Sequence, residues 1–92
     1  MADIDELRSK IAEADRRLMD ALAERDSVAR EIGRYKLSME LPIRNTEVEG
    51  KVMERFEDLG REREIDPRTA RDLATVAIKD AVEVQSLSLI HI

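Results

Sequence analysis

The stretch that decides the fold runs from Asp3 to about Leu37 and reads DIDELRSKIAEADRRLMDALAERDSVAREIGRYKL. Its apolar residues alternate by three and four, at Ile4, Leu7, Ile11, Ala14, Leu18, Ala21, Val28, Ile32 and Tyr35. This spacing predicts one long amphipathic helix with a heptad seam. The seam position between Ala21 and Val28 holds Arg25. A cation there must bend outward along its aliphatic stem or face an anion held between helices.

The length of this helix predicts an oligomer. Asp3 can cap it, with Glu6 three residues later, and no proline interrupts the pattern before Leu37. Such a helix is roughly 50 Å long, which exceeds the width of a 92-residue domain. Two shorter helices from the same chain cannot cover its seam. We therefore expect a second copy of the chain, most simply in a two-fold homodimer.

A second helix follows a proline break. Pro42 disfavours helical geometry at the residue before it and ends the first pattern. Thr46 and Glu49 then fit a Thr-x-x-Glu capping box, with Asn45 as a competing cap. The apolar spacing predicts a helix over about residues 47–64.

A third helix begins at Asp66 and Pro67, because Asp suits the cap and Pro the first helical position. Small residues dominate its apolar stripe, which allows close approach to another helix. The fold class is therefore all-α, with one very long helix and two shorter ones. We expect residues 1–86 to form a single domain.

Composition limits the classes of function. The chain has 92 residues, is 42% hydrophobic and 40% charged, contains no cysteine and carries a formal charge of -5. Its net charge disfavours nucleic acid and anionic membranes as partners. Without cysteine, disulfides and thiolate metal sites are impossible, and we expect neither a metal nor a cofactor. No apolar run approaches the roughly 20 residues of a membrane span, so the expected location is the cytoplasm.

Residues 87–92, LSLIHI, interrupt the helical pattern. A DNA sequence that can encode them resembles the transposon end used in preparing sequencing libraries. We expect these residues, which include the only histidine, to be a non-native tail. The alternative is an ordinary frayed terminus.

Four polar residues occupy inward positions and suggest a pocket. Arg25 and Lys36 lie three turns apart on nearly the same face of the first helix, close enough for both to hold one small anion. Glu49 and Gln85 lie on the inward sides of the second and third helices. Together they could line one polar site inside a helical bundle.

Each of these four residues also has a structural explanation. Arg25 could be a snorkelling or ion-paired side chain, and Lys36 could complement the helix dipole. Glu49 could serve the capping box, and Gln85 could be solvated near the chain end. Taken singly, none of them establishes a site.

A family resemblance joins these residues. The runs LRSKIAEAD at 7–15, LAER at 22–25, IGRYK at 32–36, LPIR at 41–44 and IKDAVEVQ at 78–85 are similar to the all-helical class of chorismate mutase. The resemblance implies an intertwined homodimer with two equivalent active sites. Each site would receive Arg8 from the partner subunit and Arg25, Lys36, Glu49 and Gln85 from its own chain. In agreement, Arg8 and Arg25 project roughly 100° apart on one helix.

The reaction implied by the resemblance is the rearrangement of chorismate to prephenate in phenylalanine and tyrosine biosynthesis. It needs no nucleophile or metal, only a held conformer and stabilised charge. By resemblance, Arg8 of the partner subunit and Arg25 would bind the two carboxylates. Lys36 and Gln85 would donate to the ether oxygen, and Glu49 would accept from the ring hydroxyl.

Three expected substrate-binding positions depart from the family. Where the family commonly has an aspartate and an arginine after the proline turn, this chain has Asn45 and Val48. Ala81 replaces a serine that often contacts a substrate carboxylate. We expect weaker substrate affinity, with Arg44 as a possible partial replacement for the missing cation.

Two alternatives remain open at this stage. An isochorismate-pyruvate lyase on the same fold would use similar cations for a related pericyclic elimination. A noncatalytic helical dimerisation module would explain the heptad seam by itself.

Overall fold

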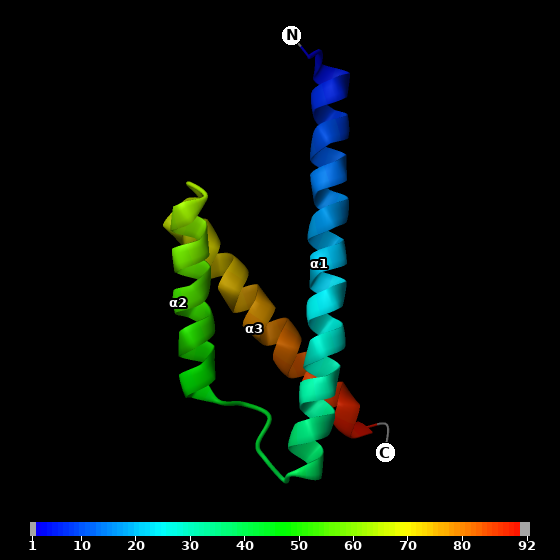
Figure 1. Ribbon diagram of the computed structural model, residues 1–92, viewed down its shortest axis with the longest axis vertical. Coiled ribbons are helices and arrows are strands. Elements are labelled where there is room, and N and C mark those ends of the chain that lie inside the picture. The colour runs from blue at the N-terminus through cyan, green and yellow to red at the C-terminus, as the bar shows by residue number, and fades with distance from the viewer. Residues whose placement is uncertain (1, 91–92) are drawn as a thin grey trace.

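The protein is an all-α chain of three helices. The computed structural model describes residues 2–90, and residues 2–87 with their side chains. The helices are α1 (Ile4–Ser38), α2 (Thr46–Glu62) and α3 (Pro67–Ile90), and the described residues contain no strand. Figure 1 shows α3 crossing between the other two helices, and it packs against both of them. The predicted fold class and number of helices are thus confirmed.

Each helix begins at a side-chain cap. The carboxylate of Asp3 accepts a hydrogen bond from the Glu6 N–H at 2.8 Å, and Asp66 accepts from Arg68 N–H at 2.8 Å. The prediction of Thr46 as the cap of α2 is wrong, because Asn45 has the extended backbone that a cap requires and Thr46 is already helical. Asn45 Oδ1 accepts from the N–H groups of residues 47 and 48 at 3.1 and 3.2 Å.

The C-terminal ends of α1 and α2 share an unexpected feature. Glu40 and Glu64 have positive φ angles of 54° and 58°, in the left-handed region that glycine usually occupies. In each case the next residue donates its N–H to a carbonyl one turn back, Leu41 to Lys36 and Ile65 to Gly60. These Schellman-type ends stop the helices, and α2 therefore ends at Glu62 rather than at about residue 64.

Small residues bring the helices together. The buried residues of α1 are Ala29 and Gly33, and those of α2 are Val52 and Gly60. A Cβ atom at Gly60 would lie 2.9 Å from the Cβ of Ala70 on α3, so glycine is needed where these two helices meet. The contact face of α1 is therefore not its heptad seam but a neighbouring stripe of short side chains.

The heptad seam of α1 remains exposed. Its large apolar residues include Ile4, Leu7, Ile11, Leu18, Val28, Ile32 and Tyr35, each at least 42% exposed. The N-terminal part of α1 extends well beyond α2 and α3 (Figure 1). The radius of gyration is 16.4 Å, whereas a compact chain of this size would have about 12 Å. One chain thus leaves its longest helix largely uncovered.

The backbone of α3 continues to Ile90. The interruption of the helical pattern that the sequence suggested at Leu87 therefore does not end the helix. His91 and Ile92 lie outside the described residues, and the non-native origin of residues 87–92 stays a prediction. Within the described residues, none of the three helices is long and apolar enough to cross a membrane.

Candidate active site

A polar pocket lies where the three helices and the α1–α2 connection meet. Its cavity has a volume of about 80 Å³. Of the eight site residues expected from the sequence, all but Arg8 line it: Arg25, Lys36, Asn45, Val48, Glu49, Ala81 and Gln85. Four apolar residues complete the wall, Ile43, Val52, Ile78 and Val82. The pocket adjoins an open hollow of about 490 Å³ between α1 and α2, which also has Arg25 and Gln85 in its lining.

Lys36 and Gln85 form the polar centre of this pocket. Lys36 Nζ donates to the carbonyl oxygen of Ile43 at 2.6 Å and to Gln85 Oε1 at 2.8 Å. An ammonium group has three donors, so one remains for a ligand. Because Oε1 accepts from Lys36, the amide nitrogen of Gln85 remains as a donor. Gln85 is only 8% exposed, so its amide is buried rather than solvated.

Arg25 is half-buried and bound on two sides. Its Nη1 donates to the carbonyl oxygen of Ala77 at 3.3 Å. Its guanidinium carbon lies 5.7 Å from the ring centroid of Phe56, so a cation–π contact joins α1 to α2. These contacts hold the guanidinium between the helices, with further N–H donors left for an anion. Arg25, the cation at an apolar position of the heptad seam, is therefore held between the helices.

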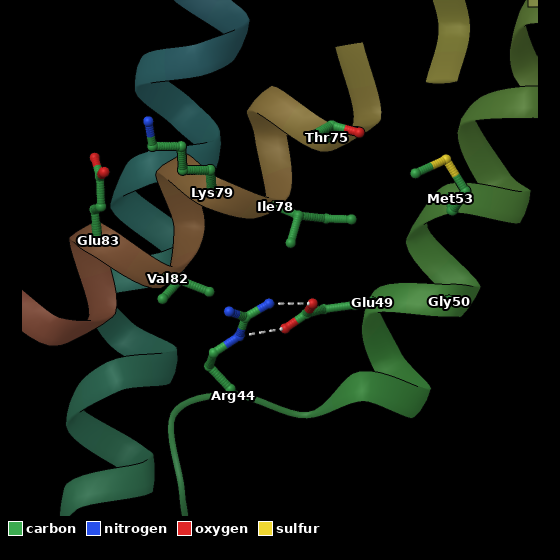
Figure 2. Close-up of a pocket in the computed structure, with 9 residues that line it drawn as sticks. All are labelled: Arg44, Glu49, Gly50, Met53, Thr75, Ile78, Lys79, Val82 and Glu83. Atoms are coloured by element: carbon green, nitrogen blue, oxygen red, sulfur yellow. Dashed lines mark hydrogen bonds and ion pairs between the residues drawn. The ribbon is translucent and has the colours of Figure 1, made fainter. Parts of the chain in front are cut away.

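Glu49 is paired with Arg44 and is not part of a capping box. Arg44 Nε and Nη2 donate to the two carboxylate oxygens of Glu49 at 3.1 and 2.7 Å (Figure 2). This charge-assisted pair lowers the pKa of Glu49, and attraction by Lys36 lowers it further, although burial acts in the opposite direction. The same pair raises the pKa of Arg44. Glu49 is therefore held as a carboxylate.

Arg8 lies far from this pocket in the same chain. It is an exposed residue near the start of α1, about 25 Å along the helix axis from Arg25. A straight helix cannot bring both residues to one pocket. A contribution from Arg8 would have to come from another copy of the chain.

The three positions that depart from the family pattern, Asn45, Val48 and Ala81, have different surroundings. Asn45 uses its side-chain oxygen to cap α2, which leaves its amide N–H₂ group for a ligand. Val48 is 51% exposed at the mouth of the pocket, and Ala81 is half-buried in its wall. Neither of the last two offers a polar side-chain atom, so the pocket has fewer donors than the family pattern would give.

Two features of the site were not predicted from the sequence. One is the binding of Glu49 by Arg44, which was considered only as a substitute cation. The other is a pair of carboxyl groups beside Arg25, Asp26 on α1 and Asp80 on α3. A hydrogen bond with Asp26, burial, and repulsion by Asp26 and Glu83 raise the pKa of Asp80, while Arg25 opposes this change. Arg44 and Glu49 are only five positions apart, and this closeness could have suggested their pairing. Residues 26 and 80 meet only in the tertiary structure.

The chain is similar in sequence to known proteins of one family. The sequence model of the family described as chorismate mutase type II matches residues 7–86. The chain is 35% identical over 83 residues to a bifunctional chorismate mutase/prephenate dehydratase of Escherichia coli K12, covering 90% of this chain and 22% of that protein. A protein of the same name from Enterobacter agglomerans is also 35% identical over 83 residues, covering 90% of this chain and 21% of the relative.

A shorter relative matches as well. A chorismate mutase of Methanocaldococcus jannaschii is 33% identical over 61 residues, covering 66% of this chain and 62% of that protein. The chain thus spans about a fifth of the length of the bifunctional relatives.

Proposed function

This chain belongs to the chorismate mutase type II family, and from that premise we propose that it converts chorismate to prephenate. The observation that carries the proposal is the meeting of Arg25, Lys36, Glu49 and Gln85, from three helices, around one pocket. This set supplies two cations, one carboxylate and one amide. Such groups bind and stabilise charge, and a pericyclic rearrangement needs no nucleophile or proton relay.

The chemistry takes place within one substrate molecule. The ether C–O bond breaks while a new C–C bond forms, so negative charge grows on the ether oxygen in the transition state. The remaining N–H donor of Lys36 and the amide N–H of Gln85 are suited to bind that oxygen. Donors fixed in advance around a developing charge stabilise it without reorganising. The hydrogen bond between Lys36 and Gln85 supports this role, because it fixes both groups.

Substrate binding would use the other polar groups. Chorismate is a dianion, and Arg25 is suited to bind one of its carboxylates. Glu49, which Arg44 keeps ionised, is suited to accept a hydrogen bond from the ring hydroxyl. Asn45, Val48 and Ala81 would contact substrate with fewer charged groups than the family pattern has, so we expect a raised KM. Holding the compact conformer would then depend mainly on the two cations.

We further propose that the active protein is an intertwined homodimer. The exposed seam of α1 and the extended shape of the single chain support this proposal, since both leave apolar surface that a second copy could cover. The partner subunit's Arg8 would enter the pocket and bind the second carboxylate. Each of the two active sites would then be shared between subunits.

The experiment is a chorismate consumption assay with the purified protein, followed by ultraviolet absorbance and with the product identified. We expect prephenate from the wild type and a loss of at least about 100-fold in Arg25→Ala. Isochorismate is tested in parallel, and its conversion to salicylate and pyruvate would assign the lyase activity instead. Folded wild type that turns over neither compound would overturn the proposal.

This proposal places the chain in aromatic amino acid biosynthesis. A cytoplasmic location, the lack of a cofactor and the lack of nucleic-acid or membrane partners stay predictions from the sequence. They are consistent with a reaction that needs only the side chains named above.

A further inference from the structure

The ion pair between Arg44 and Glu49 lies beside two cavities. On one side is the polar pocket, whose wall includes Glu49 but not Arg44. On the other is a cavity of about 620 Å³ that both residues line, together with residues of α2 and α3 (Figure 2). The Glu49 side chain is 21% exposed and that of Arg44 is 66% exposed. Arg44 thus contacts Glu49 from the larger cavity and does not line the polar pocket.

The geometry of the pair orients the Glu49 carboxylate and leaves it able to accept further hydrogen bonds. Two parallel hydrogen bonds from one planar guanidinium fix the plane of the carboxylate as well as its distance. Each carboxylate oxygen has two lone pairs, so one on each remains available for another donor. Arg44 uses its Nε–H and one Nη2–H for Glu49, and its three other N–H donors face away from this carboxylate.

We propose that Arg44 is a positioning residue for the reaction, which holds the carboxylate of Glu49 aimed into the polar pocket without touching the substrate. The inference rests on the proposed function, because Glu49 acts there as the acceptor of the ring hydroxyl. An acceptor whose rotamer is fixed in advance loses less conformational entropy when substrate binds.

Other charged groups around Glu49 do not replace Arg44. Lys36 on α1 attracts Glu49 but donates its hydrogen bonds to the Ile43 carbonyl and to Gln85. Lys79 and Glu83 on α3 line the cavity on the far side, and their charged ends point away from Glu49 (Figure 2). Arg44 is therefore the group that orients this carboxylate, and it lowers the pKa of Glu49 more than Lys36 does.

The test compares Arg44→Gln with a matched control, Arg61→Gln. Arg61 also forms an exposed ion pair, with Asp58 at 2.9 Å, but near the end of α2 and away from the pocket. We expect kcat/KM to fall roughly 10- to 100-fold in Arg44→Gln and to change little in the control. We also expect the acid limb of the pH profile to move to higher pH, because Glu49 loses the partner that lowers its pKa.

A double variant separates positioning from direct binding. If Arg44 acts through Glu49, Arg44→Gln/Glu49→Gln should be no less active than Glu49→Gln alone. Additive losses would mean that Arg44 contacts substrate itself, and they would overturn the inference. An unchanged acid limb, or equal effects of Arg44→Gln and Arg61→Gln, would do the same.

A measurement without substrate distinguishes this inference from the proposed function. Carbon NMR of the Glu49 carboxyl group should give a higher titration midpoint in Arg44→Gln than in the wild type. If the wild type is active but this midpoint does not move, the inference fails and the proposed function stands. If the midpoint moves but the folded wild type has no activity, the proposed function fails. The pair of Arg44 and Glu49 then has no role in catalysis.

Discussion

Lys36 shows at the scale of a single residue how this chain forms a polar pocket. Its side chain lies at the end of a long helix, where a lysine usually extends into solvent and complements the dipole. Here it joins the α1–α2 connection to α3 through Ile43 and Gln85. A buried amide needs such a partner, because an unpaired buried polar group costs about 1–3 kcal/mol. Lys36 therefore stabilises the fold and prepares the site with the same two hydrogen bonds.

Glu40 carries a prediction at the same scale. Its φ angle of 54° places a side chain in the left-handed region, which costs about 1 kcal/mol or more for a residue other than glycine. We expect Glu40→Gly to stabilise the protein by roughly 0.5–1 kcal/mol, measured by thermal or urea unfolding. Met39→Gly is the control, since Met39 has a φ of -100° and glycine there should only add flexibility. Stabilisation by both variants would argue against the conformational explanation.

At the scale of elements, the packing of α2 on α3 depends on Gly60. A Cβ atom there would lie 2.9 Å from the Cβ of Ala70, whereas a Cβ atom at Gly50 would meet nothing within 4 Å. We expect Gly60→Ala to destabilise the protein by about 1–3 kcal/mol because the helices must separate. Gly50→Ala is the matched control and should stabilise by up to about 1 kcal/mol, since alanine favours a helix. Urea unfolding measures both, and equal effects would contradict the packing argument.

The contact of α1 with α3 contains a pair of like charges. Asp80 Oδ2 is buried and has no hydrogen-bond donor among the described residues. A proton shared with Asp26 would supply one, and the folded state accordingly raises the pKa of Asp80 through that hydrogen bond, burial, and repulsion by Asp26 and Glu83. Arg25 is the cation that opposes the effect. The interface between these two helices should therefore depend on pH.

The sign of this dependence follows from the direction of the shift. A raised carboxyl pKa means that the folded state binds the proton more tightly than the unfolded state does. The stabilisation is complete below the unfolded pKa of Asp80 and is lost as pH rises through its folded pKa. We expect Asp80→Asn to raise the melting temperature at pH 7 and to have a smaller effect near pH 4. Asp72→Asn, at an exposed position of α3, is the control. An equal gain at both pH values would exclude the shared proton.

At the scale of the whole molecule, the chain is more extended than a domain that folds alone. Its buried apolar residues are few and small: Ala29, Val52, Ala70, Ala74, Ala77 and Val84. Small chains often need oligomerisation to bury enough surface for stability. The proposed homodimer would meet this need and would also complete the active site.

If each active site is shared between two subunits, two inactive variants should complement each other. Arg8→Ala and Arg25→Ala homodimers should each lack activity, because every site loses one cation. In a mixed dimer, one site has both substitutions and the other has neither. After unfolding and refolding together in equal amounts, random pairing should restore about one quarter of the wild-type activity. The measurement is the rate of prephenate formation before and after mixing, and no recovery in folded mixed dimers would exclude an active site shared in this way.

The sequence by itself determined the three helices and most of the polar residues that line the pocket. Helical periodicity, the caps at Asp3 and Asp66 and the break at Pro42 are local signals, because each acts over one or two turns. The same holds for Arg25 and Lys36, whose shared face follows from their spacing alone. Local rules favoured Thr46 as the cap of α2, whereas the structure uses Asn45. They also did not predict the left-handed backbone of Glu40, because glutamate rarely adopts it.

Only the tertiary structure decided which side chains meet across the helices. It paired Lys36 with Gln85 and brought Asp26 to Asp80. It also showed that α1 packs on α3 through Ala29 and Gly33 and not through the large apolar residues of its heptad seam. The physical reason is that such contacts depend on the crossing of helices far apart in the chain. An apolar seam in the sequence predicts that a surface is covered, but it does not predict which helix covers it.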